Sequence, residues 1–567
     1  MSLFGSIQLA GNALNAMQIG LQVVGNNIAN ANTPGYVREK AIFSPAPTQQ
    51  IGKLTLGLGV EVDAIVQQID RFAVDRLRDA SGDRASADIQ EKVYRDIEAI
   101  LGELSDTDIS TELSNFFNSI DNVSGEDSVP VRELVVEQGV TLTTKIANLH
   151  RRVSVLGNDF NQQVEDLASE VNTLAEEVRQ LNLNIVTIEG GEAGNTEAGG
   201  LRSQRQSALS RLSEIVDLHV TEGASGLVNL SVGGQFLVFE GTRSKVQVDY
   251  STADGQLQAK LEFVQDGSDL QVSGGELHGI YQARDGIVGE FLGQLDRFAG
   301  ALANEFNKQF SSGQGISGFR TVTGTEAVSD AGFVLDEAGL TFAPVNGSFD
   351  LLLHNKEAGI NGQSTPHTIQ VDLNGLDGDD TLTTLAAKID AIEGVTAEVT
   401  VENKLRLSAD SADVELGFSN DTSGALASLG INTFFTGDSA ATLGVNQELQ
   451  NDASKFAASN EGIGDGTGNS VALGAFQYQG LESYEGNTVT DLYDQLINST
   501  TQGSTVASAV ADGLRNFEAT LDASVQSLSG VNIDEEAIDM ILLQRTYQAS
   551  ARYLSTLSEL LDVLINI

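Results

Sequence analysis

Apolar residues recur along the last stretch of the chain with the spacing of a coiled-coil seam. They follow one another at steps of three and four residues, which is the heptad pattern of a helix that packs on another helix. The seam consists of Met540, Leu543, Tyr547, Ser550, Leu554, Leu557, Leu561 and Leu564. A second apolar line lies beside it, made of Ile538, Leu542, Ala549, Tyr553, Leu560, Val563 and Ile567. A helix that is apolar over so much of its circumference predicts packing partners on two sides.

The first stretch of the chain shows the same pattern. Its heptad positions are Leu3, Ile7, Ala10, Leu14, Met17, Leu21, Val24 and Ile28. No charged residue occurs from Ser2 to Val37, although 20% of the chain is charged. An uncharged outer face favours burial among other chains over exposure to water. Periodicity alone also allows a frayed helix that folds back on its own domain.

Helical periodicity also marks the interior of the chain. Helices are expected at 70–102, 109–123, 201–217 and 489–528, and another opens with Gly274 to Ile280. The longest opens after Pro130 and keeps an apolar stripe to Ile188, which corresponds to a rod of roughly 80 to 90 Å. Alternating apolar and polar residues predict strands within 219–275 and 311–444. The second of these regions contains an expected strand, helix and hairpin between Thr368 and Ser408.

These elements predict a multidomain α+β fold. We expect the N- and C-terminal helices to pair as a coiled coil, further helices to form an elongated rod domain, and mainly-β domains to be inserted on the outside. The expected domains are a terminal coiled coil (1–40 and 530–567), a helical rod (41–217, 279–312 and 450–529), an inserted β unit (218–278) and an outer β-rich domain (313–449). In this order the chain leaves through helices and returns through helices, so its two ends can lie side by side.

Charge narrows the range of partners. The chain has 79 acidic and 32 basic side chains and a formal net charge of −47. Nucleic acid and anionic membrane surfaces are bound through clusters of Lys and Arg, so both are unexpected partners. The chain has no cysteine, which removes thiolate chemistry and disulfides. Its first thirty residues lack the basic and apolar regions of a cleaved secretory signal, and its apolar runs are too short to span a bilayer.

Motifs for catalysis are weak or incomplete. Gly313-x-Gly315-x-x-Gly318 has the spacing of a dinucleotide loop, but it follows a helix and precedes none. The acidic stretch from Asp372 to Gly378 has the wrong spacing for a calcium loop. The five histidines show no metal-ligand or triad spacing. We therefore expect no enzymatic activity, no cofactor and no metal site.

The turn after the first helix carries a specific motif. Asn26 to Tyr36 reads NNIANANTPGY, and the Pro34-Gly35 turn requires the helix to end near Asn32. An Asn-Ile-Ala-Asn run followed by Thr-x-Gly-Tyr resembles the N-terminal signature of the bacterial flagellar axial family, which comprises rod, hook and hook-associated proteins. The resemblance implies an assembly role for this helix and turn, with candidate residues Leu3, Ile7, Leu14, Met17, Leu21, Val24, Asn27, Ile28, Asn30, Thr33, Pro34, Gly35 and Tyr36.

Other segments resemble the hook-associated branch of this family. They are LRSQRQSALSRLSEIVD from Leu201 to Asp217, in which Ser203 and Gln206 stand where Asp is expected, and GGELHGI from Gly274 to Ile280. The C-terminal segment from Gly530 is also similar, through Gly530 to Glu536, Gln544, Tyr547, Gln548, Ala549 and Ala551. Its candidate residues for assembly and chaperone binding are Ile538, Met540, Leu542, Leu543, Tyr547, Leu554, Leu557, Leu560, Leu561 and Leu564.

The resemblance implies a secreted structural subunit at the junction between the flagellar hook and filament. It implies self-association in a helical tube, the hook protein on one side and a second junction protein, FlgL, on the other. It also implies type III export and a cytoplasmic export chaperone on the C-terminal helix. Two alternatives remain open: another axial subunit such as a large hook protein, and a secreted adhesin or enzyme carried on flagellar-type termini.

Overall fold

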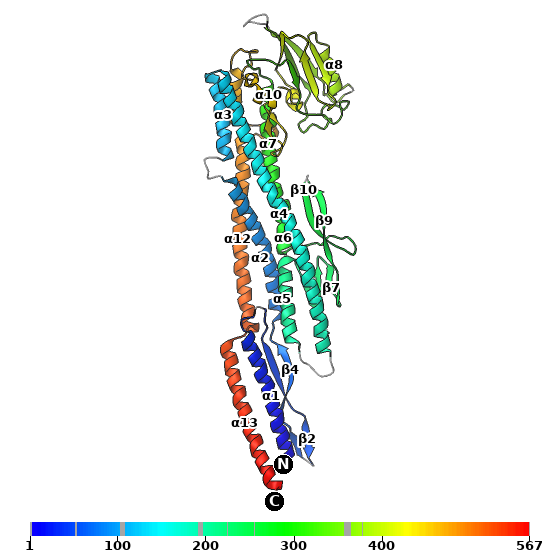
Figure 1. Cartoon of the computed structure of the whole chain (residues 1–567), viewed down its shortest axis with the longest axis vertical. Helices are drawn as coiled ribbons and strands as arrows, with labels where there is room; N and C mark the ends of the chain where they lie inside the picture. The colour runs from blue at the N-terminus through cyan, green and yellow to red at the C-terminus, as the bar shows by residue number, and fades with distance from the viewer. Residues whose placement is uncertain are drawn as a thin grey trace. The chain divides into compact units, whose positions relative to one another are not determined.

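The computed structural model describes residues 3–33, 35–51, 54–102, 108–190, 197–223, 225–253, 256–356, 364–376 and 378–565. The chain forms two compact units, each built from separate stretches of sequence. Unit 1 comprises Met1–Val93, Asn158–Arg284 and Thr505–Ile567, and unit 2 comprises Tyr94–Gly157 and Asp285–Ser504. Both ends of the chain belong to unit 1, in which the blue and red terminal helices lie side by side (Figure 1).

The helices of unit 1 follow the expected periodicity. They are α1 (Leu3–Asn30), α5 (Gly199–Ile215), α6 (Gly275–Tyr281) and α13 (Ile533–Ile565). Helical segments whose residues divide between the two units are α2 (Arg71–Leu101), α4 (Val129–Glu189), the π-helical turn η1 (Gln282–Val288) and α12 (Val489–Ser529). The start of α4 differs from the expected one, because Pro130 lies within its first turn rather than before it. Proline suits that position, since an N–H there has no partner within the helix.

The strands of unit 1 form antiparallel pairs. They are β1 (Glu39–Pro45), β2 (Thr48–Ile51), β3 (Leu54–Gly57), β4 (Val60–Gln67), β5 (His219–Glu222), β6 (Val228–Val232), β7 (Gln235–Phe239), β8 (Thr242–Arg243), β9 (Val246–Ala253) and β10 (Gln256–Phe263). The strands β1 and β4 pair with each other, as do β2 with β3 and β9 with β10, while β5 to β8 form a meander. A bulge at Asp63 shifts the pairing between Ile42 and Phe43.

Unit 2 combines helices with a β domain. Its helices are α3 (Ile109–Gly125), α7 (Gly289–Ser311), α8 (Leu382–Asp390), α9 (Ala425–Ser428), α10 (Gln447–Asn451), η3 (Ala453–Lys455), α11 (Gly468–Ala475), η4 (Phe476–Tyr478) and η5 (Glu482–Tyr484). Its strands are β11 (Thr321–Thr323), β12 (Gly347–Asn355), β13 (Ser364–Val371), β14 (Val395–Val399), β15 (Leu405–Ala409), β16 (Val414–Ser419), β17 (Phe435–Thr436) and β18 (Gly444–Val445).

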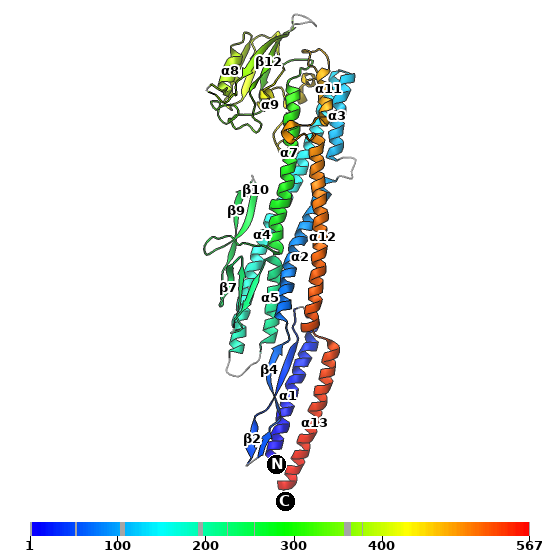
Figure 2. The same cartoon turned by 180° about the vertical axis from the view of Figure 1, so that it is seen from behind.

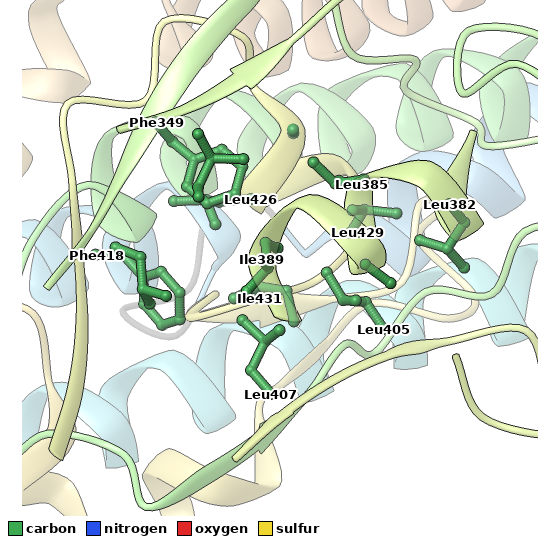
Figure 3. Packing of buried hydrophobic residues seen from close by; sticks show 14 of the residues in the cluster. Phe349, Leu382, Leu385, Ile389, Leu405, Leu407, Phe418, Leu426, Leu429 and Ile431 are labelled. Atoms are coloured by element: carbon green, nitrogen blue, oxygen red, sulfur yellow. The ribbon is translucent and has the colours of Figure 1, made fainter. Parts of the chain in front are cut away.

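The β domain of unit 2 has a compact apolar core. Its strands form two three-stranded sheets, ordered β13-β12-β16 and β11-β15-β14. Helix α8 contributes Leu382, Leu385 and Ile389 to this core, where they pack with Leu405 and Leu407 of β15 (Figure 3). The expected strand, helix and hairpin unit is therefore confirmed by β13, α8 and the β14–β15 pair.

Phenylalanines hold the β domain of unit 2 against its helices. Phe434 packs against Phe116 of α3 and Phe306 of α7, with ring centroids 5.3 Å and 5.6 Å away. All three side chains are fully buried. Gly139 of α4 makes room for this cluster, because a Cβ atom there would lie 2.7 Å from the Phe434 ring. A side chain at position 139 would therefore force the cluster apart.

Three asparagines of α4 dock the β insert of unit 1. Asn161, Asn172 and Asn182 are 11 and 10 residues apart, which is about three helical turns and places them on one face. A side-chain amide has both a donor and an acceptor, so it can satisfy the two backbone groups of one strand residue. Asn182 donates to the Val228 carbonyl at 2.8 Å and accepts from its N–H at 3.2 Å.

The other two members of this asparagine ladder repeat the contact. Asn172 donates to the Val246 carbonyl at 2.8 Å and accepts from its N–H at 3.1 Å. Asn161 donates to the Leu257 carbonyl at 2.7 Å and accepts from the Ala259 N–H at 2.9 Å. The ladder therefore fixes β6, β9 and β10 in register along the helix.

We expect Asn182→Ala to loosen the β insert. Asn182 is fully buried, and its loss leaves both backbone groups of Val228 and one N–H of Arg205 without their partner. The expected cost is about 2 to 4 kcal/mol. Hydrogen exchange at β6 measures it, and Asn184→Ala is the matched control because that side chain is exposed on the same helix. Equal exchange in both variants contradicts a role for the ladder.

Arginines of unit 1 organise part of the acidic excess. Arg211 of α5 contacts Glu170 of α4 at 2.7 Å, Glu214 of its own helix at 2.9 Å and Glu276 of α6 at 2.6 Å. Several acids share one guanidinium because its planar fork offers five donors. Isolated surface pairs contribute little, but such a network ties three helices together.

Candidate functional site

The C-terminal helix α13 packs its seam against α1. Leu557 is buried, and Met540, Leu543, Leu554 and Leu561 are half-buried. The approach is close at Gly20 of α1, where a Cβ atom would lie 3.2 Å from Leu543. The same atom would lie 3.2 Å from Phe43 of β1, so α1 is held between α13 and the β1–β4 pair. The expected pairing of the two terminal helices is confirmed (Figure 2).

Small residues of α1 are buried more deeply than most of its heptad positions. The buried residues Ala16, Gly20, Val23 and Asn27 form a line of their own. The candidate positions Ile7, Leu14, Met17, Leu21 and Ile28 are half-buried, and Val24 is buried. Because α1 has neighbours on two sides, short side chains allow both to approach it closely. The side chain of Leu3 lies outside the described residues.

Asn27 connects the turn motif to α13. Its side-chain amide donates to the Glu39 carbonyl at 2.9 Å and to Glu536 Oε2 of α13 at 3.0 Å. Its oxygen accepts from the Tyr36 hydroxyl at 2.9 Å and from the Glu39 N–H at 3.0 Å. The residue is 1% exposed and uses its full hydrogen-bonding capacity.

Arg38 completes the connection from the other side. Its Nε lies 2.7 Å from Glu536 Oε1, and its Nη1 lies 3.1 Å from Glu535 Oε2. Its backbone N–H donates to the Ser529 carbonyl at 3.0 Å, where α12 ends. We name Asn27, Tyr36, Arg38, Glu39 and Glu536 the terminal clamp. Within it, one buried carboxylate receives donors from both Asn27 and Arg38, which is the arrangement that a buried charge requires.

The environment of the terminal clamp keeps Tyr36 protonated. Burial, together with the nearby Glu39 and Glu536 carboxylates, raises the pKa of Tyr36 to about 12. Burial also raises the pKa of Glu39, with a further contribution from Glu197. The neutral Tyr36 hydroxyl therefore remains a donor to Asn27 across the physiological pH range.

The remaining residues of the motif shape the turn. Asn30 donates to the Asn26 carbonyl at 3.0 Å and accepts from the Thr33 hydroxyl at 3.3 Å. Gly35 has φ +74°, a left-handed conformation that favours glycine. Pro34 lies outside the described residues. Asn30, Thr33 and Gly35 thus close the helix, whereas Asn27 and Tyr36 reach across to other elements.

The LRSQRQ helix α5 anchors the other side of the turn. Ser203 accepts a hydrogen bond from the Val37 N–H at 3.3 Å and another from Gln67 at 2.9 Å. The Ser203 hydroxyl therefore accepts these bonds at the position where the resemblance led us to expect Asp. Arg202 pairs with Glu189 at 2.7 Å, and Arg205 donates to Asn182 at 2.9 Å. The segment fixes the terminal turn, the end of α4 and the β insert to one another.

The second apolar line of α13 is exposed on unit 1. Ile538 is 65% exposed and Leu542 is 61% exposed, and Ala549, Tyr553, Leu560 and Val563 are also exposed. We name these six residues the outer line. Tyr547 of the seam is also exposed, and the side chain of Leu564 lies outside the described residues. An exposed apolar stripe of this kind marks an interaction surface.

Sequence reasoning did not single out Arg38, Glu39 or Glu536. Arg38 is the first charged residue after the uncharged run from Ser2 to Val37, and that position was the available signal. Asn532 and Glu535 have the spacing of a capping box at the start of α13. In the structure Asn532 accepts from the Asp534 N–H at 3.0 Å, and Glu535 Oε2 lies 3.1 Å from Nη1 of Arg38.

Other candidate sites are not assembled. The Gly313 to Gly318 loop connects α7 to β11, with no helix after it. The acidic stretch from Asp372 to Gly378, whose spacing is wrong for a calcium loop, includes Asp377, which lies outside the described residues. Within the part of the chain that the structure covers, no cluster of three or more His, Asp or Glu side chains is placed to hold a metal ion. In that same part, none of the helices has both the length and the hydropathy of a membrane-spanning segment.

Family comparisons match three parts of the chain. Residues 94–325 match the helical domain of flagellar hook-associated protein FlgK. Residues 7–36 match the flagella basal body rod protein family, and residues 524–567 match the C-terminal region of the basal body rod FlgEFG proteins. The last two matches contain the motif turn with most of α1, and the whole of α13.

Individual proteins resemble the chain over its full length. Flagellar hook-associated protein 1 of Salmonella typhimurium is 23% identical over 99% of both chains, and that of Bacillus subtilis is 25% identical over 100% of this chain and 98% of its own. The solved structure of the flagellar hook junction protein FlgK from Burkholderia pseudomallei has a TM-score of 0.50 at 15% identity, and covers 80% of this chain and 100% of its own. That structure supports the fold.

The matches at both ends and in the helical body are all to models of bacterial flagellar axial proteins. Within that class, the chain is similar from end to end to flagellar hook-associated protein 1.

Proposed function

We propose that this chain is a structural subunit of the hook-filament junction of the bacterial flagellum. It acts outside the cell, in a helical tube of its own copies, between the hook protein and the second junction protein, FlgL. The full-length similarity to flagellar hook-associated protein 1 and the multidomain α+β fold support this function. For this function, we divide the chain into a terminal module (1–40 and 530–567), a helical rod, and β domains at 218–278 and 313–449.

The observation that carries the proposal is the state of the terminal helices. They are paired within one copy and fixed by the terminal clamp, yet the outer line of α13 is exposed and much of the α1 heptad line is only half-buried. A subunit that folds by itself and then assembles with other copies needs both an ordered terminal pair and an apolar surface that is still exposed. Neighbouring copies would then bury the outer line. The burial of each large apolar side chain would stabilise the contact by about 1.5 to 3 kcal/mol.

Export imposes a second requirement on the outer line. In the proposed pathway the chain leaves the cytoplasm through the flagellar type III route, and a cytoplasmic chaperone covers α13 beforehand. The exposed Ile538 and Leu542 support this role, since apolar side chains without a partner invite premature association. Removal of residues 537–567 should abolish both chaperone binding and assembly.

Immunogold labelling tests the position of the subunit. A single band at the distal end of the hook is expected, and a strain without the protein should carry hooks, lack filaments and shed flagellin into the medium. Label along the whole hook assigns the chain to the hook itself, and filaments of normal number in the deletion strain contradict the junction role.

A further inference from the structure

Unit 1 contains a groove that the paired termini do not fill. It has a volume of about 640 Å³, a size typical of ligand-binding clefts. The turn from Gly35 to Val37 and three helices line it. The apolar and small side chains are Val74 and Leu77 of α2, Ser207 and Ser210 of α5, and Ala519 and Val525 of α12.

Two buried side-chain atoms in the groove can donate a hydrogen bond but have no partner among the described residues. They are Nε of Arg78, whose residue is 9% exposed, and Oγ of Ser529, whose residue is 5% exposed. Both residues line the groove. The Arg78 guanidinium is engaged elsewhere through Nη2, 2.9 Å from Asp75, so Nε is the free position. A buried donor without an acceptor costs free energy, and an occupant of the groove could supply the acceptor.

The charges around the groove select a neutral occupant. Glu518 and Asp522 also line it. Glu518 accepts from Ser81 and is paired with Arg84 at 2.6 Å, and Asp522 accepts from Gln526. Arg78, the cation among the lining residues, is already paired with Asp75, so the groove offers a free anion no unpaired positive charge. A peptide carbonyl accepts a hydrogen bond without bringing charge, and an apolar side chain next to it would fill the apolar walls. These properties describe a protein segment.

We propose that this groove is a docking socket for a segment of a second copy of this chain, through backbone carbonyls that accept from Arg78 and Ser529. This inference rests on the proposed self-association. Along the chain, the exposed Leu528 precedes the lining residues Ser529 and Gly530, and the exposed Ile533 follows them, so exposed apolar side chains lie between the socket residues and the outer line in sequence. In such a head-to-tail contact, the socket of one copy binds a different surface of the next copy. Contacts of this type build helical assemblies.

A substitution that fills the socket tests whether the groove is needed for assembly or for the stability of the isolated subunit. Ala519→Phe places a ring in the groove, so the isolated protein should melt at an unchanged or higher temperature. The amount of protein recovered in purified hook-filament complexes should fall by at least about tenfold. Ala523→Phe is the matched control, because Ala523 is exposed on the same helix but does not line the groove. Normal recovery of Ala519→Phe overturns the inference.

Crosslinking identifies the occupant. Benzoylphenylalanine at position 210 should link to a second copy of the chain in complexes and to nothing in dilute monomer, whereas a link to the hook subunit or to another protein overturns the choice of occupant. Leu542→Glu, in the outer line, separates the two proposals. If it blocks assembly while Ala519→Phe does not, the proposed function stands and the socket is rejected. If neither blocks assembly, the socket and the outer line are both rejected as contacts between copies, whereas the proposed function fails only if the deletion strain has a normal number of filaments.

Discussion

The variant Asn27→Ala is expected to release α13 from α1. It removes four hydrogen bonds, leaves the Tyr36 hydroxyl without its acceptor and takes one donor from the buried Glu536. A buried network of this kind costs about 3 kcal/mol when its centre is removed. Opening of the terminal pair should therefore become about 100-fold more frequent. Hydrogen exchange along α13 measures this directly, and exchange in unit 2 should not change.

Asn30→Ala is the matched control within the same motif. Among the described residues its side chain bonds to Asn26 and Thr33 near the helix end and to no other element, and it is partly exposed, so the expected cost stays below about 1 kcal/mol. Equal effects of the two variants would show that the motif acts only by ending α1.

A charge test shows whether Asn27 acts through Glu536. Asn27→Asp places a second carboxylate about 3 Å from Glu536, where Nδ2 now donates at 3.0 Å, and should open the pair more than Asn27→Ala. The second change Glu536→Gln restores a donor opposite the new carboxylate and should recover part of the loss. No recovery in the double variant contradicts a direct contact.

The terminal helices were predictable because their signal is local. Heptad spacing over eight positions at each end indicates a helix and its apolar side, and the motif's proline limits where α1 can end. The same reasoning placed α2, α3, α4 and α12 and the small unit around α8. Each of these depends on residues close together in the sequence.

The terminal clamp was not predictable in the same way. Asn27 and Glu536 are 509 residues apart, and the signature contains both Asn27 and Asn30 without distinguishing their roles. Burial separates them: Asn27 faces the narrow space where α1, β1 and α13 meet. The asparagine ladder escaped notice for a related reason, since a polar residue within an apolar stripe reads as an interruption until its backbone partners are known.

Burial also explains why the seam and the outer line differ in role although both are apolar. The sequence shows two lines on α13 and cannot say which one α1 covers. In the structure α1 covers the seam, because Gly20 admits Leu543 closely while the small line of α1 also accepts the β1–β4 pair. The outer line is left for contacts between copies. Adjacent residues of α13 should therefore respond differently to the same substitution.

Leu542→Glu should abolish assembly and leave the single subunit intact. Leu542 is 61% exposed, so a carboxylate there stays hydrated in the monomer and changes its stability by less than about 0.5 kcal/mol. At a contact between copies, the same carboxylate is buried without a partner, and each contact loses the apolar side chain as well. A loss of about 2 kcal/mol per contact weakens association about 30-fold. Recovery of the variant in hook-filament complexes measures the effect.

Leu543→Glu, one residue further, is the matched control. Its side chain packs against Gly20, so the charge should open the terminal pair within the subunit. The free energy needed to open the pair should fall by about 2 to 4 kcal/mol, and hydrogen exchange along α13 should rise. Both variants should fail to assemble, but only Leu543→Glu should lose internal protection. If Leu542→Glu assembles at the normal level, copies do not meet through the outer line. If it loses protection to the same degree as Leu543→Glu, the outer line is covered within the subunit, and its exposure cannot be the feature that makes neighbouring copies necessary.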